Sequence, residues 1–271
     1  MSLAMLYTLS EWLIIAVFIA LLLLIAEGGF RLGHRLRPRV TEAVKSQISS
    51  IQAAILALFG LLLAFTMSMA VSRYDARKQL VVEEANAIGT TYLRAQLLPQ
   101  PHRAEISRLL RDYVDVRLQF FDAGADQERI QQVNDATGRF HRQLWAGATA
   151  LGELDPRAVT TGLFIQSLNE VIDLPTKRLA ALENRVPEVV MLLLFAGAIC
   201  SLGLIGCSHG LEDQRNLVMS VLFALLISLV ILVIIDLDRP RRGLIQVSQQ
   251  SMSDLQKSLG QFVLEGGEQR Q

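Results

Sequence analysis

The chain alternates between long apolar runs and polar stretches, and four of the runs have the length of a membrane-spanning helix. The longest run without an ionisable side chain extends from Ser46 to Ser72. Two more extend from Val189 to Cys207 and from Asn216 to Ile235. A shorter run, Trp12 to Ala26, reaches sufficient length when it is extended to Phe30. Because a helix needs about 20 apolar residues to cross the hydrocarbon core, the pattern predicts four transmembrane helices.

The spacing of these runs divides the chain into two hairpins with a polar insert between them. We expect a first transmembrane hairpin over residues 1–72 and a second over residues 187–238. Residues 73–186 are expected to form a helical soluble domain that is continuous with the second span, and residues 239–271 an amphipathic C-terminal helix and tail. The predicted fold class is therefore all-α: an integral membrane protein with four transmembrane helices in two hairpins.

The polar insert begins with a pattern that continues the second span. Its apolar residues step by four, three and four positions, as one face of a helix does: Val81, Ala85, Ile88 and Tyr92. No proline interrupts the chain before Pro99, so we predict a single helix over about residues 51–98. Such a helix would be about 72 Å long, far more than a membrane is thick. The average spacing of 3.5 residues is typical of a coiled-coil seam, which indicates that this helix packs against neighbours.

The remaining polar residues also show helical periodicity and the signals that start and stop helices. One helix is expected to end at Gly124. Another is expected to start at Asp155-Pro156, where an N-cap residue precedes a proline at the first helical position. Pro175 is expected to kink or break this second helix. The predicted helices cover residues 102–122, 127–148 and 155 onward, with an amphipathic tail over 244–263.

Composition excludes several classes of function. The 271 residues are 51% hydrophobic, and 26 Lys and Arg balance 26 Asp and Glu, so the formal net charge is zero. A chain without a basic surplus is not expected to bind nucleic acid. The four histidines and two cysteines lack metal-ligand spacing, and no phosphate-loop, dinucleotide-binding or nucleophile-elbow motif is present. We therefore predict that the protein is not an enzyme, with no catalytic residues, no metal site and no cofactor.

One stripe of the second span has the chemistry of a pore wall. Leu61, Phe65, Ser68 and Ser72 step by four, three and four residues and share one helix face. Apolar constrictions gate pores by dewetting, and hydroxyls replace part of an ion's hydration shell. Leu61 and Phe65 are the predicted gate, and Glu84, further along the helix, is predicted to lie in a vestibule. The alternative is that the hydroxyls hold helices together or bond to carbonyls of their own helix.

Acidic residues near the ends of the spans need partners. Asp236 and Asp238 end the fourth span, where the helix dipole disfavours anions. We expect them to form structural ion pairs with Arg73 and Arg77, which leave the membrane on the same side; a cation site is the alternative. Glu27, near the end of the first span, is expected to pair with a basic residue one turn away, or else to be a functional intramembrane carboxylate.

Three stretches resemble the signature blocks of a known family. They are SRYDARKQLVVEEANAIGTTYLRAQLLP after the second span, DLDRPRRGLIQVSQQS after the fourth and LAALENRVP before the third. These blocks resemble the bestrophin-like domain family, a group of bacterial membrane proteins distantly similar to bestrophins, which are pentameric ion channels. The resemblance implies a bestrophin-like ion channel with an axial pore lined by the second transmembrane helix. The chain departs from bestrophins in two ways: its second span has no Asn-Pro-Pro, and no dense acidic run follows its fourth span.

The resemblance also implies the setting of the protein. We expect a homo-oligomer, a pentamer as in bestrophins, in the lipid bilayer of the bacterial inner membrane, with the soluble domain cytoplasmic and small inorganic ions as the permeating species. An alternative hypothesis follows from the coiled-coil-like spacing and from the lack of a strongly polar residue in the stripe. In that hypothesis the protein is a membrane-anchored oligomeric scaffold or sensor that binds a partner through its helical soluble domain.

Overall fold

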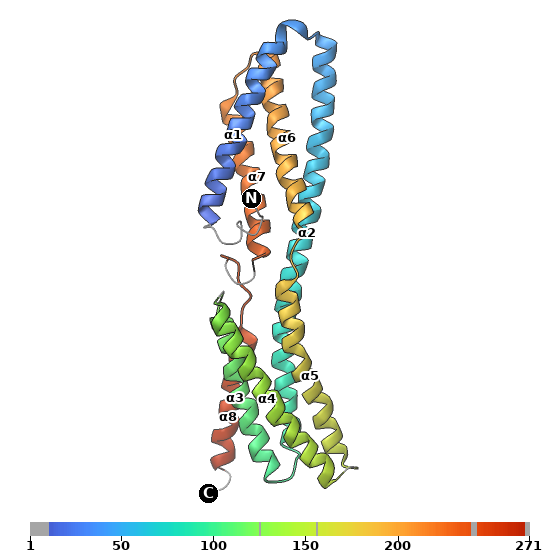
Figure 1. The fold of residues 1–271 in the computed structure, drawn as a ribbon, viewed down its shortest axis with the longest axis vertical. Helices are drawn as coiled ribbons and strands as arrows, with labels where there is room; N and C mark the ends of the chain where they lie inside the picture. Colours follow the sequence, from blue (N-terminus) through green and yellow to red (C-terminus); the bar gives the residue numbers. More distant parts are fainter. Residues whose placement is uncertain (1–10, 125, 156, 240–242, 269–271) are drawn as a thin grey trace. The chain divides into compact units, whose positions relative to one another are not determined.

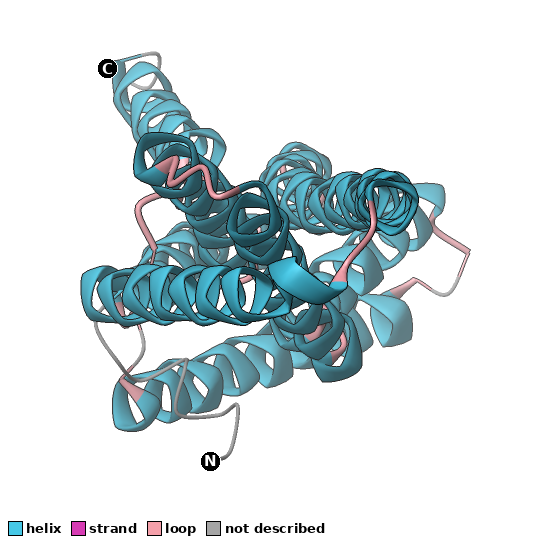
Figure 2. Cartoon of the chain, turned by 90° about the horizontal axis from the view of Figure 1, so that it is seen from above, coloured by secondary structure: helices cyan, strands magenta, loops and turns pink. Residues whose placement is uncertain are grey.

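The computed structural model describes residues 11–124, 126–155, 157–239 and 243–268. Every regular element in this part of the chain is a helix, as Figure 2 shows. In chain order the elements are α1 (Glu11–Leu36), η2 (Arg37–Arg39), α2 (Glu42–Ala95), α3 (His102–Asp122), α4 (Gln127–Leu154), α5 (Val159–Glu183), α6 (Glu188–Glu212), α7 (Leu217–Leu237) and α8 (Gln250–Glu268). Four helical stretches are long and apolar enough to cross a membrane, and they include α1, α2, α6 and α7 (Figure 1). The predicted all-α membrane fold is therefore confirmed.

The chain forms two compact units. The membrane unit combines Met1–Ser72 with Arg185–Arg239, and the soluble unit combines Arg73–Asn184 with Pro240–Gln271. The two apolar hairpins thus belong to one unit, and the residues after the fourth span belong to the unit made by the polar insert. Helix α2 has 54 residues and runs without a break from the first unit into the second.

In the membrane unit, α1 packs backbone to backbone against α6. A Cβ atom built on Gly206 would lie 2.0 Å from the carbonyl oxygen of Ala26, and one on Gly210 would lie 2.1 Å from that of Phe30. Glycine is required at these positions because any side chain would push the two helices apart. Small residues let helices approach closely where lipid supplies no hydrophobic driving force, and this contact joins the first hairpin to the second.

The membrane half of α2 is largely uncovered in the single chain. Between residues 42 and 72 only Phe59, Thr66 and Ala70 are buried. Phe59 packs against α6, where a Cβ built on Gly197 would lie 2.5 Å from its ring. Most of the surface of this span is therefore free to contact lipid or other copies of the chain.

The soluble unit is built on the other half of α2. Its buried core includes Ile88 and Tyr92 of α2, Leu110 of α3, Leu144 of α4 and Phe164 of α5. Helix α8 adds Met252 and Leu259 to the same core. Helix α3 has the predicted bounds, and Gly124 adopts a φ of +53° directly after it, a conformation that glycine accepts at little cost.

Several predicted bounds differ from the structure. Helix α2 begins at Glu42 rather than at about residue 51, and α4 ends at Leu154 rather than at residue 148. Two further helix starts and one predicted break differ as well. Asp155 caps the end of α4 rather than the start of α5, which begins at Val159; Pro156 lies outside the described residues. Helix α5 continues through Pro175, and Arg178, one turn further on, forms a buried ion pair with Glu84. The tail helix begins at Gln250 rather than at residue 244. Gln246 to Gln249 form a non-helical segment of the soluble unit, in which Val247 is buried.

Candidate functional site

The predicted stripe on α2 is exposed along its whole length. Leu61 and Phe65 are 52% and 64% exposed, and Ser68 and Ser72 are exposed as well. At 3.6 residues per turn the four side chains fall within about 60° of the helix circumference. The structure thus places these four residues on one uncovered face, with the apolar pair before the hydroxyl pair.

The same face continues beyond the apolar part of α2 and becomes more polar. Asp75, Gln79, Glu83, Asn86 and Thr90 are all exposed. Their steps of four, four, three and four residues keep them within about 80° of the circumference and in line with Leu61. The side-chain amide nitrogen of Gln79 donates to Oε1 of Glu83 at 3.3 Å. Beyond Ser72 the predicted ion path named only Glu84. The sequence signal for these five residues was the continuation of the same spacing past Ser72.

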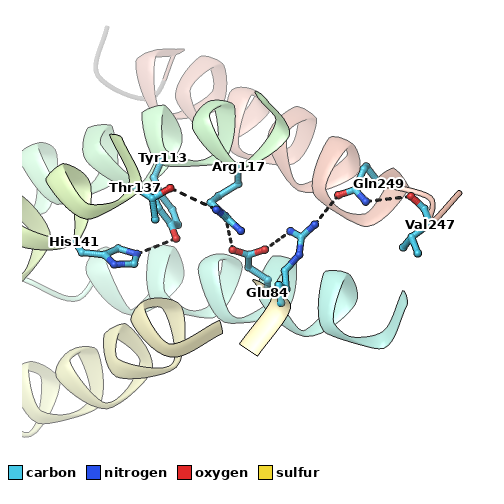
Figure 3. A network of polar contacts seen from close by, with 8 residues as sticks. Glu84, Tyr113, Arg117, Thr137, His141, Val247 and Gln249 are labelled. Atoms are coloured by element: carbon cyan, nitrogen blue, oxygen red, sulfur yellow. Dashed lines mark hydrogen bonds and ion pairs between the residues drawn. The ribbon is translucent and has the colours of Figure 1, made fainter. Parts of the chain in front are cut away.

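Glu84 does not belong to this face, which corrects the predicted vestibule position. Its side chain is fully buried in the soluble unit. Nε of Arg117 donates to Oε1 of Glu84 at 2.6 Å, and Nη1 of Arg178 donates to Oε2 (Figure 3). A buried carboxylate is stable only when it is paired, and here two guanidinium groups from α3 and α5 supply the pairing. Glu83, its neighbour, is the carboxylate that faces outward.

The buried carboxylate is the centre of a polar network that joins the helices of the soluble unit. Nη1 of Arg117 contacts Oγ1 of Thr137 on α4 at 3.4 Å. Nη2 of Arg178 donates to Oε1 of Gln249 at 3.2 Å, and Nε2 of Gln249 donates to the carbonyl of Val247 at 3.1 Å. Figure 3 shows these side chains converging from separate elements. The network holds the soluble half of α2 in a defined rotation about its axis, so the polar stripe stays outside.

A tyrosine–histidine pair extends this network. The hydroxyl of Tyr113 and Nε2 of His141 are 3.0 Å apart. Burial, reinforced by the nearby Arg117, lowers the pKa of His141 to about 4, so its ring is neutral at physiological pH. Burial likewise raises the pKa of Tyr113 above its usual value, so the hydroxyl keeps its proton. Both groups therefore act as neutral structural partners.

The acidic residues at the end of α7 are buried, as are Arg239, which follows them in sequence, and Arg77 of α2. Asp236 and Asp238 are 3% and 2% exposed, and Oδ1 of Asp238 accepts the backbone N–H of Val186 at 2.8 Å. In the soluble unit, Nε and Nη2 of Arg77 donate to the carbonyls of Ala181 and Asn184 at 3.0 and 3.1 Å. The pairing of Asp236 and Asp238 with Arg73 and Arg77 remains a prediction.

Glu27 is paired with two arginines. Its carboxylate accepts from Arg31 at 2.8 Å, one turn along α1, and from Nη2 of Arg215 at 2.7 and 2.8 Å. Arg215 also lies over the ring of Phe30, 5.2 Å from its centroid. These contacts connect α1 to the turn between α6 and α7. Glu27 therefore has a structural role, in agreement with the expected ion pair one turn away.

Comparisons with solved structures agree on the fold. A bacterial bestrophin homologue from Klebsiella pneumoniae that carries a point mutation matches with a TM-score of 0.65 and 18% sequence identity, over 92% of this chain and 98% of that chain. A structure of a bestrophin homologue from the same organism, phased with zinc, matches with a TM-score of 0.61 and 19% identity, over 90% and 97% of the two chains. At these identities the likeness shows a shared fold. No curated protein matches the chain.

A comparison with protein families covers most of the chain. The model of the Bestrophin-like domain matches residues 18–252, a range that contains α2 to α7 and the three sequence blocks described above. This protein is therefore a member of the Bestrophin-like domain family.

Proposed function

We propose that the protein is an ion channel, assembled from identical subunits around a symmetry axis, with the exposed face of α2 as the wall of the pore. The observation that carries this proposal is the continuous exposed stripe of α2, which is apolar at Leu61 and Phe65 and polar from Ser68 to Thr90. Large exposed apolar patches mark contacts with other proteins or with the membrane. Identical copies that meet at this face would cover it and enclose a path.

The order of residues along the stripe gives each part a role. Rings of Leu61 and Phe65 form an apolar constriction that stops ions when it is narrow enough to lose its water. The hydroxyls of Ser68 and Ser72 follow and replace part of the hydration shell. Asp75 and Glu83 then place rings of carboxylates beyond the span, where they concentrate cations.

The assembly and its setting belong to the same proposal. We infer a pentamer in the bacterial inner membrane, with the soluble unit in the cytoplasm. Support comes from the membership of the Bestrophin-like domain family and from the solved structures of bacterial bestrophin homologues that share the fold. The small number of buried residues in the membrane half of α2 supports assembly independently of those relatives.

The direct test is ion flux through liposomes that contain the purified protein. A channel gives flux above that of empty liposomes for at least one small inorganic ion. Flux equal to that of empty liposomes for sodium, potassium and chloride alike would reject the proposal. The structure of the purified assembly adds a second criterion, since a channel has a water-filled axis bounded by α2.

Apolar residues exposed on the soluble unit favour a second candidate function. Leu93, Leu97, Leu154 and Val159 are each more than half exposed. A membrane-anchored scaffold or sensor would use such a surface to bind a partner protein. In that case the axis of the assembly is sealed or filled with lipid, and these side chains stay exposed in the assembly; in a channel, contacts between copies cover them.

A further inference from the structure

The soluble unit contains a cavity of about 250 Å³ that the proposed ion pathway does not use. Its walls come from α2, from the ends of α3 and α5, and from the non-helical segment before α8. The space is large enough for several waters or for a small organic molecule. Sites for small molecules usually combine an apolar wall with a few polar groups, and this cavity has both.

The polar part of the wall carries two buried guanidinium groups. Arg77 and Arg178 both line the cavity and are only 4% and 7% exposed. A guanidinium has five N–H donors, and Arg178 uses two of them on Glu84 and Gln249. Asp122, the carboxylate among the described lining residues, is exposed. Among the described lining residues, the buried polar end of the cavity is therefore formed by two guanidinium groups.

The charge balance beside the cavity points in the same direction. Glu84 is the one buried carboxylate between Arg117 and Arg178, so this described cluster retains one positive charge. The ring of Phe120, which lines the cavity, lies 4.8 and 5.9 Å from the guanidinium carbons of these two arginines. Of the two arginines, Arg178 lines the cavity, and Arg117 lies behind it on the other side of Glu84. Because a surplus buried charge is costly, an anion beside Arg178 would be stabilised.

The rest of the wall is apolar. Leu80, Val81, Phe121, Leu182 and Val247 line the cavity. These apolar side chains make no favourable polar contact with an inorganic anion. They would, however, bury the hydrocarbon part of an organic anion. Burial of apolar surface contributes about 25 cal/mol per Å², so a ring or a branched chain would add affinity.

We propose that this cavity binds a small organic carboxylate with an apolar body, whose carboxylate lies at Arg77 and Arg178 and whose body lies against Leu80 and Val247. The segment from Gln246 to Gln249, which follows the last span, lines the cavity, so the ligand stabilises its packing on the soluble unit.

The test is calorimetric titration of the purified full-length protein with three probes. Benzoate carries both features, benzamide has the ring without the charge, and acetate has the charge without the ring. Benzoate should bind saturably with a Kd of about 1 mM or tighter, and benzamide and acetate about tenfold more weakly or worse. Absence of saturable benzoate binding would overturn the proposal, and equal binding of benzamide or acetate would overturn the ligand class.

A matched pair of variants locates the site. Val247→Phe fills the cavity and should abolish benzoate binding, whereas Val218→Phe makes the same change at a residue of α7 that is 67% exposed and outside the cavity, and should leave it unchanged. Unchanged binding in Val247→Phe would place benzoate elsewhere and refute the site. If Val247→Phe does not fold, a structure of the unaltered protein with 4-iodobenzoate decides: an iodine peak inside the cavity supports the proposal, and a peak elsewhere or none rejects it.

Discussion

Glu83 and Glu84 are neighbours on α2, yet Glu83 lies on the exposed stripe and Glu84 is fully buried between Arg117 and Arg178. A step of one residue rotates a side chain by about 100° around a helix, and that rotation separates the two roles. One carboxylate is available to ions or solvent, and the other holds the soluble unit together.

This difference predicts opposite effects on stability. Glu84→Gln should destabilise the protein by about 3–5 kcal/mol, because it leaves two buried guanidinium groups without a counter-charge. Glu83→Gln, the same chemical change on the exposed face, should alter stability by less than about 0.5 kcal/mol. Thermal unfolding of both variants in detergent checks the prediction. Equal effects of the two substitutions would contradict the assigned orientations.

The exposed carboxylates should set the preference for cations. In the channel, Asp75→Asn and Glu83→Gln should each lower the ratio of cation to anion permeability. A unit charge about 4 Å from an ion contributes about 1 kcal/mol in water, which is roughly a fivefold change. Reversal potentials in asymmetric salt measure the ratio. Thr90→Ala, at an exposed uncharged position on the same stripe, is the control and should leave the ratio unchanged. A ratio that neither Asp75→Asn nor Glu83→Gln lowers would show that these carboxylates do not set the preference.

The apolar pair on the stripe should limit flux. Leu61→Ala and Phe65→Ala widen the proposed constriction and make dewetting less favourable, so both should raise ion flux through liposomes. Leu24→Ala removes the same atoms as Leu61→Ala from a residue on α1 that is 69% exposed, and should leave flux unchanged. Flux that falls or stays constant in both stripe variants would place the constriction elsewhere.

The contact between α1 and α6 should tolerate no added methyl group. Gly206→Ala introduces a Cβ 2.0 Å from the carbonyl oxygen of Ala26, so the helices must separate, and overpacking of this kind costs about 1–3 kcal/mol. Gly28→Ala is the matched control, because a Cβ there meets nothing within 4 Å. We expect a lower midpoint of thermal unfolding for Gly206→Ala than for Gly28→Ala. The reverse order would mean that the two backbones are not in contact.

Stability should fall as the pH drops below the usual pKa of histidine. The pKa of His141 is lowered from 6.5 to about 4 in the folded protein, so the unfolded chain binds a proton more readily. The contribution of the neutral ring is complete above about pH 6.5 and is lost progressively as the pH falls toward 4. His141→Gln keeps a hydrogen-bond partner for Tyr113 but cannot take up the proton. The unfolding midpoint of this variant should therefore change less between pH 6.5 and 4.5 than that of the unaltered protein. An equal change of the midpoint in both proteins would show that His141 does not cause the pH dependence.

The sequence by itself determined the helical class, the four spans and the position of the stripe from Leu61 to Ser72. These features depend on local hydropathy and on the period of the helix, and both are written in short stretches of chain. The bounds of α3 followed for the same reason, because periodic apolar residues end at a glycine that accepts a positive φ.

The tertiary structure alone decided which polar residues turn inward. The burial of Glu84 depends on arginines 33 and 94 positions away. Helix α5 continues through Pro175, where the local signal predicted a kink or a break. The close contact of α1 with α6 likewise joins glycines and carbonyls about 180 residues apart in sequence. Local periodicity carries no information about such pairs, because their free energy arises only when distant segments exclude water and lipid from each other.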